Sequence, residues 1–514
     1  MEGGALNAHE LLELAVRAVP DKEALYDRTR RLSYRELGEE VGHAAAALRT
    51  LGVRQGDRVG VALPNWSEAV ALYFAVSRIG AVLVPFNPRY RTNEVRHILR
   101  HSGVRVLFVC EENAAVALES APPGLETVTV RFRQNGLASY DGLLADSRRV
   151  PEPEPVPASE DDVFCMLYTS GTTGVPKGAL VTHRCVVRSG RTIAAATRCG
   201  EDDVFLIVAP IFHVFGMACN LMAAVACRAK MVLLDRFKAI DALRLIEQER
   251  VTVQHAVPTM LNLELKCPEF DSFDLSSLRV GMTGASPCPP ETIRGVTEKM
   301  GMRLLISYGT TETGTVTITE YDEREDRLYN SVGKAVEGVE VRIVDDARRP
   351  VALGEVGEIA CRGFGVMKGY DGMPEQTREV LDEAGWYYTG DLGRMDEDGY
   401  VYYMGRKKEL IIRGGYNIYP QELEGLLMQH PKVLECAVVG LPDPVMGEIV
   451  CAAVRLRPGE SATEDELVDY LKGQVADYKL PSKVVFVDEF PATASGKIQK
   501  TQLRELIMAG GRSE

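Results

Sequence analysis

The stretch from Phe164 to His183, FCMLYTSGTTGVPKGALVTH, decides how this chain is interpreted. An apolar run typical of a strand leads into a loop rich in glycine and hydroxyl residues, and a second apolar run follows Lys177. Glycines let backbone N–H groups approach an anion, hydroxyls add hydrogen-bond donors, and a lysine supplies a mobile positive charge. The stretch therefore predicts a phosphate-binding loop.

The spacing of this loop differs from that of a Walker A motif. Walker A requires a glycine directly before its lysine and a serine or threonine after it. Here Pro176 precedes Lys177 and Gly178 follows it. The chain is therefore not expected to be a Walker-type nucleoside triphosphatase. A plain polar loop between two strands is the simpler alternative, which the complete run from Thr169 to Gly178 disfavours.

Length and composition limit the class of protein. A chain of 514 residues with 46% hydrophobic and 26% charged residues predicts a globular protein with at least two domains. The formal net charge of −14 argues against a nucleic-acid-binding surface. Eleven cysteines are scattered without a CxxC pair. They are expected to be reduced and mostly buried thiols of a cytoplasmic protein, neither disulfides nor zinc ligands.

Neither a secretion signal nor a membrane anchor is expected. The N-terminus lacks the basic start and apolar core of a signal peptide. The segment from Leu206 to Cys227 is long and apolar, but Pro210, His213 and Asn220 interrupt it. A buried strand, a loop and a helix are favoured over a transmembrane helix.

Hydrophobic periodicity predicts alternating helices and strands in the first half of the chain. Helical spacing occurs at residues 9–19 and 34–51, and strand-like runs occupy residues 58–62, 82–84 and 104–110. This alternation predicts layered α/β sheets that are largely parallel. The proline-rich and acidic segment 149–162 is expected to be an exposed connector into the phosphate loop.

The second half of the chain predicts two further units. Glycines recur among short strand-like runs between residues 331 and 406, which favours a small twisted or barrel-like sheet. Beyond it, helical runs at 420–429 and 464–475 alternate with strand-like runs at 435–440 and 450–456. The last hundred residues are therefore expected to form a small α+β domain.

Several later motifs carry residues suited to a nucleotide. Glu312 lies in the strand-to-turn run LLISYGTTETG, and Asp391 lies in the run WYYTGD. A carboxylate suits Mg²⁺ beside phosphates, and its two acceptor oxygens suit the neighbouring hydroxyls of a ribose. Near the end of the chain, Gly496 precedes Lys497 in the run PATASGKIQK. A flexible glycine lets the lysine ammonium reach a reaction centre.

The phosphate loop, the run IFHVFG at 211–216, the two carboxylate motifs and the terminal Gly-Lys loop together resemble the ANL superfamily of adenylate-forming enzymes. That superfamily comprises acyl-CoA synthetases, peptide-synthetase adenylation domains and luciferases. The resemblance extends from about residue 9 to residue 503, with the motifs in the family order. It implies a large N-terminal domain at residues 1–407 and a small mobile C-terminal domain at residues 408–514, hinged at Lys408.

The resemblance also assigns roles to individual residues, with ATP, Mg²⁺ and CoA as the expected ligands. The catalytic residues it implies are Lys497, His213, Thr311 and Glu312, of which Glu312 is the Mg²⁺ ligand. The ATP contacts it implies are Thr169, Ser170, Gly171, Thr172, Thr173, Gly174, Lys177, Gly284, Ala285, Ser286, Tyr308, Gly309, Thr310, Thr311, Asp391, Arg406 and Lys497. The acyl pocket it implies consists of His213, Val214, Phe215, Cys219, Ala285, Gly309, Gly314 and Val316, and the CoA and hinge segment includes Lys408, Gly414 and Gly415.

The uncharged pocket segment favours one branch of the superfamily. Phe212 to Phe215 contains no acid that could pair with the ammonium of an amino acid, and Ser307 replaces the arginine expected of a malonate-activating enzyme. The expected reaction joins an apolar monocarboxylic acid, either fatty or arylalkanoic, to CoA through an acyl-adenylate. Transfer to a carrier protein or an amine remains the alternative, and non-catalytic binding is disfavoured. The sequence leaves the chain length of the acid and the oligomeric state open, a homodimer included.

Overall fold

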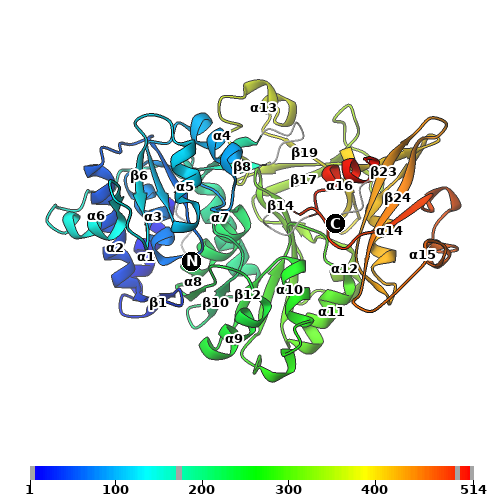
Figure 1. Ribbon diagram of the computed structural model, residues 1–514, viewed down its shortest axis with the longest axis horizontal. Helices are drawn as coiled ribbons and strands as arrows, with labels where there is room; N and C mark the ends of the chain where they lie inside the picture. Colours follow the sequence, from blue (N-terminus) through cyan, green and yellow to red (C-terminus); the bar gives the residue numbers. More distant parts are fainter. Residues whose placement is uncertain (1–5, 170–175, 493–497, 510–514) are drawn as a thin grey trace.

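The computed structural model describes residues 6–169, 176–492 and 498–509, which form four β-sheets and their covering helices (Figure 1). Of the predicted site residues, Ser170, Gly171, Thr172, Thr173, Gly174 and Lys497 lie outside these described residues. The fold is a large N-terminal domain of layered sheets followed by a small C-terminal domain, as the sequence predicts.

The first sheet is seven-stranded in the order β7-β6-β5-β3-β4-β8-β9, and only the pair β8 and β9 is antiparallel. Its strands are β3 (Arg58–Ala62), β4 (Val82–Pro85), β5 (Val106–Val109), β6 (Glu126–Thr129), β7 (Ala138–Ser139), β8 (Val163–Thr169) and β9 (Lys177–Thr182). The associated helices are α1 (Ala8–Ala18), α2 (Tyr34–Thr50), α3 (Ser67–Arg78), α4 (Thr92–Ser102), α5 (Glu111–Ser120), α6 (Tyr140–Ser147) and α7 (His183–Ala196).

The second sheet is nine-stranded in the order β16-β15-β14-β13-β12-β10-β11-β1-β2, with a parallel centre and antiparallel edges. Its strands are β1 (Glu23–Tyr26), β2 (Arg31–Ser33), β10 (Val204–Ile207), β11 (Lys230–Leu233), β12 (Val253–His255), β13 (Val280–Thr283), β14 (Arg303–Thr310), β15 (Gly314–Ile318) and β16 (Lys334–Ala335). The helices along it are the π-helix η1 (Phe215–Met222), α8 (Ala223–Cys227), α9 (Ala239–Glu249), α10 (Pro258–Leu265), the 3₁₀ turn η2 (Phe270–Ser272), α11 (Pro290–Lys299) and α12 (Glu325–Asn330).

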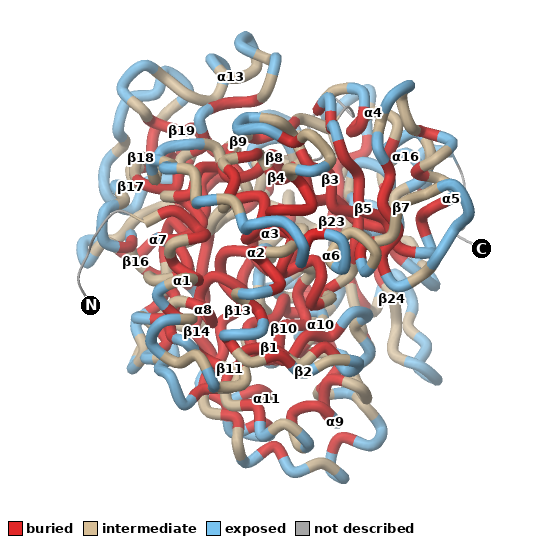
Figure 2. Tube along the Cα trace, turned by 90° about the vertical axis from the view of Figure 1, so that its left-hand side faces the viewer, coloured by how far each residue is buried: buried red, intermediate tan, exposed pale blue. Residues whose placement is uncertain are grey.

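A buried helical layer joins the two large sheets. Helix α3 is buried from Ser67 to Ser77, because it is apolar on nearly all sides and contacts β3 and β4. Helix α2 contacts β1 and β2 of the other sheet as well as α3. Asn7 and Ser33 begin α1 and α2 with capping boxes, which fix the ends of both helices. Figure 2 shows this layer as part of the continuous buried core.

The third sheet is the small antiparallel one that the glycine-rich segment predicts. Its order is β17-β18-β19-β20, and an isolated bridge between Lys334 and Tyr400 connects it to the edge of the second sheet. The elements are β17 (Val339–Val344), β18 (Gly357–Gly363), α13 (Pro374–Val380), β19 (Tyr387–Met395), β20 (Val401–Arg406) and the 3₁₀ turn η3 (Lys407–Glu409).

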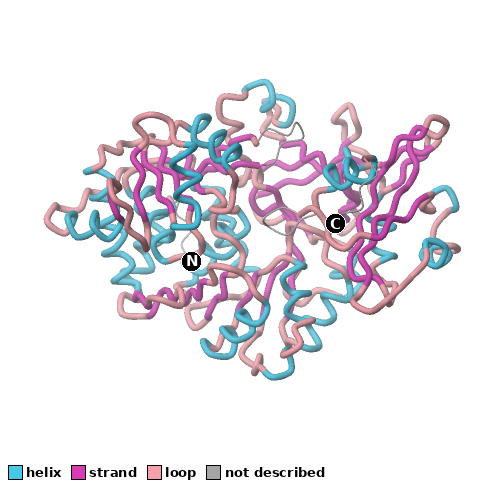
Figure 3. The backbone as a smooth tube through the Cα atoms, viewed as in Figure 1, coloured by secondary structure: helices cyan, strands magenta, loops and turns pink. Residues whose placement is uncertain are grey.

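The C-terminal domain has a separate core, and Figure 3 shows its strands grouped apart from the N-terminal layers. Its strands are β21 (Ile411–Arg413), β22 (Tyr416–Ile418), β23 (Val433–Asp443), β24 (Gly447–Leu456) and β25 (Lys483–Phe486). Its helices are α14 (Pro420–Leu427), α15 (Glu464–Leu471), the 3₁₀ turn η4 (Asp477–Lys479) and α16 (Lys500–Met508). Helix α15 ends four residues before the predicted Val475, because Gly473 adopts a left-handed conformation with φ of 79°.

Two further predictions can be compared with the fold. The segment from Leu206 to Cys227 forms the end of β10, a loop, η1 and α8, as predicted. Within residues 6–169, 176–492 and 498–509, we find no helix with the length and apolarity needed to cross a membrane. The prediction that the cysteines are mostly buried is confirmed, since all except Cys199, Cys267 and Cys288 are buried.

Candidate active site

The predicted phosphate loop connects the two antiparallel strands β8 and β9. Thr169 pairs with Lys177 in the register of this hairpin, so the residues on either side of the loop lie side by side. Strand β9 is held on its other edge by the segment 368–371, since Leu180 N–H donates to Gly369 O and Asp371 N–H donates to Gly178 O. The described ends of the loop are therefore fixed by backbone hydrogen bonds on both sides.

Tyr370, in that same segment, connects the loop to the predicted metal ligand. The Lys177 ammonium lies 5.0 Å from the centre of the Tyr370 ring, and the Tyr370 hydroxyl donates to Glu312 Oε1 at 2.9 Å. Thr169 Oγ1 donates to the same carboxylate oxygen at 3.4 Å. Burial, assisted by the charge of Glu312, raises the pKa of Tyr370 and keeps its hydroxyl a donor.

These contacts form what we call the phosphate cluster, consisting of Thr169, Lys177, Glu312 and Tyr370. Three of its four members were predicted from the sequence, although they are separated by up to 143 positions. Tyr370 was missed, because its position matters only once the segment 368–371 pairs with β9. No local pattern in the sequence signals that pairing.

A second polar group surrounds Asp391. The Tyr308 hydroxyl donates to Asp391 Oδ2 at 2.7 Å, and Arg406 Nε lies 2.8 Å from Asp391 Oδ1. Asp391 and Arg406 are paired residues of β19 and β20, and Tyr308 lies on β14 of the neighbouring sheet. Burial, followed by the charge of Asp391, raises the pKa of Tyr308, so the phenol stays neutral beside the carboxylate. We call this the Asp391 cluster.

Close backbone packing requires glycine at the turn between β14 and β15. A Cβ atom at Gly309 would lie 1.9 Å from the carbonyl oxygen of Gly314. Thr310 N–H donates to Thr313 Oγ1 at 2.9 Å, which holds the turn that presents Thr311 and Glu312. The predicted nucleotide residues Tyr308 to Thr311 therefore sit on one constrained hairpin that leads directly to the phosphate cluster.

A small apolar cavity of about 10 Å³ lies between η1 and α10, with room for about one water molecule. It is lined by Ala209, Pro210, His213, Phe215, Gly216, Val257, Met260 and Ala285. Three of these, His213, Phe215 and Ala285, were predicted for the acyl pocket. Ala285 directly follows Gly284 and precedes Ser286, and its φ of 65° is unusual for a residue with a side chain.

The other predicted pocket residues lie outside the lining of this cavity. Val214, Cys219 and Val316 are buried, and Cys219 Sγ lies 3.8 Å from Thr315 Oγ1. Gly314 is also buried, and a Cβ there would lie 2.8 Å from Cys185 Sγ. Val257 and Met260 were missed, although the run HAVPTML at 255–261 is an apolar strand end followed by a helix-starting proline. That pattern could have marked a corner facing a cavity.

Local geometry explains how the cavity wall is built. Asn65 holds the backbone before it, since its amide donates to the carbonyl oxygens of Ile207 and Ala209 and its Oδ1 accepts from Ile211 N–H. Phe215 N–H donates to His213 Nδ1 at 3.2 Å, which orients the imidazole. The π-helix η1 then begins at Phe215, an arrangement that is frequent at functional sites.

The predicted hinge lies between two anchored residues. Lys407 forms ion pairs with Asp346 at 2.9 Å and Glu358 at 3.1 Å in the N-terminal domain. Glu409 pairs at 3.3 Å with Lys500 of the C-terminal domain, whose side chain is partly buried. Lys408 lies between them and is exposed. Gly414 and Gly415 both have positive φ and form the exposed turn between β21 and β22.

Comparisons with known proteins agree with this arrangement. Residues 12–371 match the family model described as AMP-binding enzyme, and residues 422–497 match the AMP-binding enzyme C-terminal domain. The chain is 38% identical to the putative acyl-CoA synthetase YngI of Bacillus subtilis, with 96% of each chain covered. It is 36% identical to the medium-chain fatty-acid–CoA ligase of Escherichia coli, covering 96% of this chain and 89% of the relative.

A solved structure gives the same result. The anthranilate CoA ligase AuaEII in complex with anthranoyl-AMP superimposes with a TM-score of 0.92 at 29% identity, covering 98% of both chains. The similarity therefore includes both domains and spans essentially the whole chain.

Proposed function

The chain belongs to the AMP-binding enzyme family, and from that premise we propose that it converts an apolar monocarboxylic acid, ATP and CoA into acyl-CoA, AMP and pyrophosphate. The observation that carries the proposal is the phosphate cluster, in which Tyr370 brings Lys177 and Glu312 together, and a separate apolar cavity offers a surface for the acid. A positive charge, a carboxylate and an apolar surface are what an acid and a nucleotide triphosphate require at one place.

In the first half-reaction, a carboxylate oxygen of the acid attacks the α-phosphorus of ATP. The bond from that phosphorus to the bridging oxygen breaks, pyrophosphate leaves, and the acyl-adenylate remains. Lys177 would attract the departing phosphates, and Lys497, which lies outside the described residues, is assigned to the charge that develops at the α-phosphate. Thr311 would donate to a phosphate oxygen from the turn that also carries Glu312.

The residues around Glu312 fit a Mg²⁺ ion that is held mainly by substrate. The described residues contain no group of three metal-ligating side chains, and Glu312 is the single carboxylate of the phosphate cluster. Mg²⁺ keeps several waters and is usually bound by one or two carboxylates together with substrate phosphates. When bound, it would offset the negative charge of the phosphates.

The nucleoside is assigned to the Asp391 cluster. Asp391 is 1% exposed, accepts a hydrogen bond from Tyr308 and forms an ion pair with Arg406, so its carboxylate is fixed in orientation. Its acceptor oxygens suit the two hydroxyls of a ribose, and Arg406 can contact the sugar and the phosphate beyond it. Gly284, Ala285 and Ser286 provide the adjoining surface, where a flat base can approach backbone.

The acid is assigned to the cavity between η1 and α10. Its lining contains no lysine, arginine or carboxylate, and a second charged group on the substrate would be costly to bury there. We therefore propose a monocarboxylic acid with an apolar body. The similarity to a medium-chain fatty-acid–CoA ligase favours a medium-chain fatty acid over an aryl acid.

In the second half-reaction, the CoA thiolate attacks the acyl carbonyl carbon, and AMP leaves as the C–O bond to its phosphate breaks. We propose that the domains divide at residues 407 and 408 and that the C-terminal domain rotates about Lys408 between the two steps. The anchoring of Lys407 to one domain and of Glu409 to the other supports this position for the hinge. Rotation would bring Gly414 and Gly415 to the pantetheine arm of CoA.

The eleven cysteines support a reducing compartment, and we propose the cytoplasm as the location. Immunodetection in cytoplasmic and organelle fractions checks this. Recovery in an oxidising compartment would contradict it.

The test is a measurement of pyrophosphate and AMP release from ATP against a panel of fatty and aryl acids, with and without CoA. Pyrophosphate release with a fatty acid, and sustained AMP release only with CoA, is the expected result. Pyrophosphate release that is the same with and without CoA would favour transfer of the acyl group to a carrier protein or an amine. Absence of any acid-dependent release from folded protein that binds ATP would contradict an enzymatic role.

A further inference from the structure

A second cavity, none of whose lining residues belongs to the phosphate cluster, lies between the two domains. Its volume is about 420 Å³, within the range of about 300–1,000 Å³ typical of small-molecule sites. Helices α10 and α11 of the N-terminal domain form one side. Met428, after α14, and Arg457, after β24, form the other side. No part of the proposed reaction uses this space.

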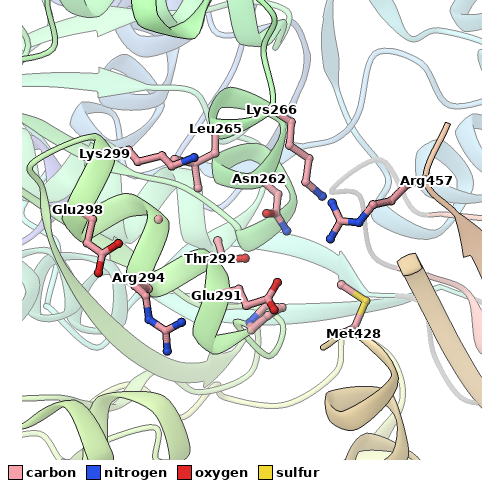
Figure 4. Close-up of a pocket in the computed structure, with 12 residues that line it drawn as sticks. Asn262, Leu265, Lys266, Glu291, Thr292, Arg294, Glu298, Lys299, Met428 and Arg457 are labelled. Carbon is pink, nitrogen blue, oxygen red and sulfur yellow. The ribbon is translucent and has the colours of Figure 1, made fainter. Parts of the chain in front are cut away.

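Two cations from opposite domains point into the cavity. Figure 4 shows the Lys266 ammonium and the Arg457 guanidinium directed toward each other, with the Asn262 amide beside them, while Arg294 and Glu298 point away. Arg457 Nε is buried and has no hydrogen-bond partner. Burial and then the charge of Arg457 lower the pKa of Lys266, although Glu291 and Glu435 act in the opposite direction. The two cations are therefore incompletely compensated.

The mixture of charges in the lining points to a class of ligand. An arginine fork and a lysine point charge together suit a phosphate group. Glu291, however, also lines the cavity and would repel a bare inorganic anion. A carboxylate, an amide and the hydroxyl of Thr292 are suited to the hydroxyl and amino groups of an attached sugar or base.

We propose that this interdomain cavity binds a nucleotide, with its phosphates between Lys266 and Arg457 and its nucleoside against Asn262, Glu291 and Thr292. This site is separate from the one assigned to ATP at Tyr308 and Asp391. Because Met428 and Arg457 belong to the C-terminal domain, the ligand contacts both domains at once.

The experiment is photolabelling of the full chain with 8-azido-ADP, followed by peptide mapping. Label is expected on peptides that contain residues 258–266, 428 or 457, in addition to label at the site assigned to ATP, which includes residues 284–286. The variants Lys266→Gln and Arg457→Gln should each lower the cavity label about tenfold, since each removes charge-assisted hydrogen bonds to phosphate. Label at the ATP site should stay unchanged and serves as the internal reference.

A matched control is Lys432→Gln, which removes the same charge from the C-terminal domain outside the cavity. Lys432 pairs with Glu466 at 2.7 Å, and its carbonyl oxygen accepts from Arg457 N–H. The amount of label in the cavity of the Lys432→Gln variant should equal that in the unmodified chain. Label confined to the ATP site, or cavity label that persists in both Lys266→Gln and Arg457→Gln, would overturn the proposal.

A competition experiment distinguishes the contribution of the nucleoside to binding from that of the phosphates. Unlabelled ADP should displace the cavity label at concentrations at which inorganic pyrophosphate does not. Equal displacement by pyrophosphate would show that the nucleoside contributes nothing, and would overturn the assignment to a nucleotide. None of these readouts depends on acid activation, so failure here is distinguishable from failure of the proposed reaction.

Discussion

The nucleotide side and the acid side of the candidate active site are built by different means. On the nucleotide side, Lys177, Glu312 and Asp391 come from recognisable motifs and are held by charged and hydrogen-bonded contacts. On the acid side, apolar residues such as Val257 and Met260 pack around a cavity with almost no free volume. The contrast teaches that reaction type is fixed by polar groups at fixed spacing, whereas substrate choice depends on how apolar surfaces fit.

The largest effect is expected on the nucleotide side, from Glu312→Gln. The substitution keeps the size of the side chain but removes its negative charge. That charge would hold Mg²⁺ and strengthens the hydrogen bond that Glu312 Oε1 accepts from the Tyr370 hydroxyl. Losing one preorganised electrostatic contact typically costs a factor of about 10²–10³ in rate. Acid-dependent pyrophosphate release should fall by that factor, and the loss should be equal for every acid in a panel. A loss that varied with the acid would contradict the separation of the two sides.

The next effect concerns the lining of the cavity on the acid side, at Gly216. A Cβ atom there would lie 2.1 Å from the carbonyl oxygen of Pro210, which is backbone and cannot move alone. Gly216→Ala should lower the free energy of unfolding by about 1–3 kcal/mol, as overpacking typically does. Urea denaturation followed by circular dichroism measures this.

The control is Gly425→Ala in helix α14, where a Cβ would meet no atom within 4 Å. Alanine is favoured over glycine inside a helix by about 0.5–1 kcal/mol, so this variant should be as stable as the unmodified chain or more so. If both variants lost stability equally, the close approach at Gly216 would not be the cause.

On the acid side, Met260→Phe should change selectivity without changing the nucleotide reaction. Met260 lines the cavity from α10, and a bulkier ring would occupy space that a longer acyl chain needs. Pocket changes of this kind are worth about 1–3 kcal/mol, or a factor of about 10–200 in kcat/KM between acids. The ratio of kcat/KM for long over short acids should fall, and the KM for ATP should stay constant. If the KM for ATP changed together with the selectivity for acids, packing on the acid side would also affect ATP binding, and the two sides would not be independent.

The same contrast explains how much could be predicted from the sequence. Alternating helices and strands predicted β3 at its exact bounds, and motif spacing predicted Lys177, Glu312 and Asp391 as candidate site residues, because each depends on local residue order. Tyr370 and Met260 could not be found in this way. Their roles arise when segments far apart in the chain meet, as when residues 368–371 pair with β9. The shortening of α15 was missed because the left-handed Gly473 lies just beyond the apolar pattern.

The last prediction, with an effect of at most about 1.4 kcal/mol per pH unit, tests a buried ionisable group behind the acid side. Glu264, on the same helix as Met260, is fully buried, and Gln254 Nε2 donates to its Oε1 at 2.7 Å. Glu264 Oε2 and Gln254 Oε1 are both acceptors without a partner. A proton on Glu264 would let its hydroxyl donate to Gln254. Burial raises the pKa of Glu264 from 4.5 to about 8, in agreement with a neutral acid.

The sign of the pH dependence follows from this shift. Between pH 4.5 and about 8 the folded chain keeps the proton on Glu264 and the unfolded chain releases it. The contribution of Glu264 to the free energy of unfolding should therefore fall as pH rises through this window, by at most about 1.4 kcal/mol per pH unit, and the loss should end above the folded pKa. Burial lowers the pKa of nearby His255 from 6.5 to about 3, so His255 contributes with the opposite sign below pH 6.5, and that contribution does not depend on ionisation of Glu264. Burial, followed by the nearby Glu269, changes the pKa of Cys267 in the upward direction.

Urea denaturation of the unmodified chain and of Glu264→Gln, at intervals from pH 5 to pH 9, isolates this contribution. The glutamine keeps hydrogen-bonding capacity toward Gln254 but cannot ionise. The stability of the unmodified chain should therefore fall relative to that of Glu264→Gln as pH rises. Identical slopes for the two proteins would mean that Glu264 is already ionised in the folded state. The acid side would then contain a buried charge, as the nucleotide side does. The contrast between an apolar side and a charged side would be weaker than the apolar lining of the cavity suggests.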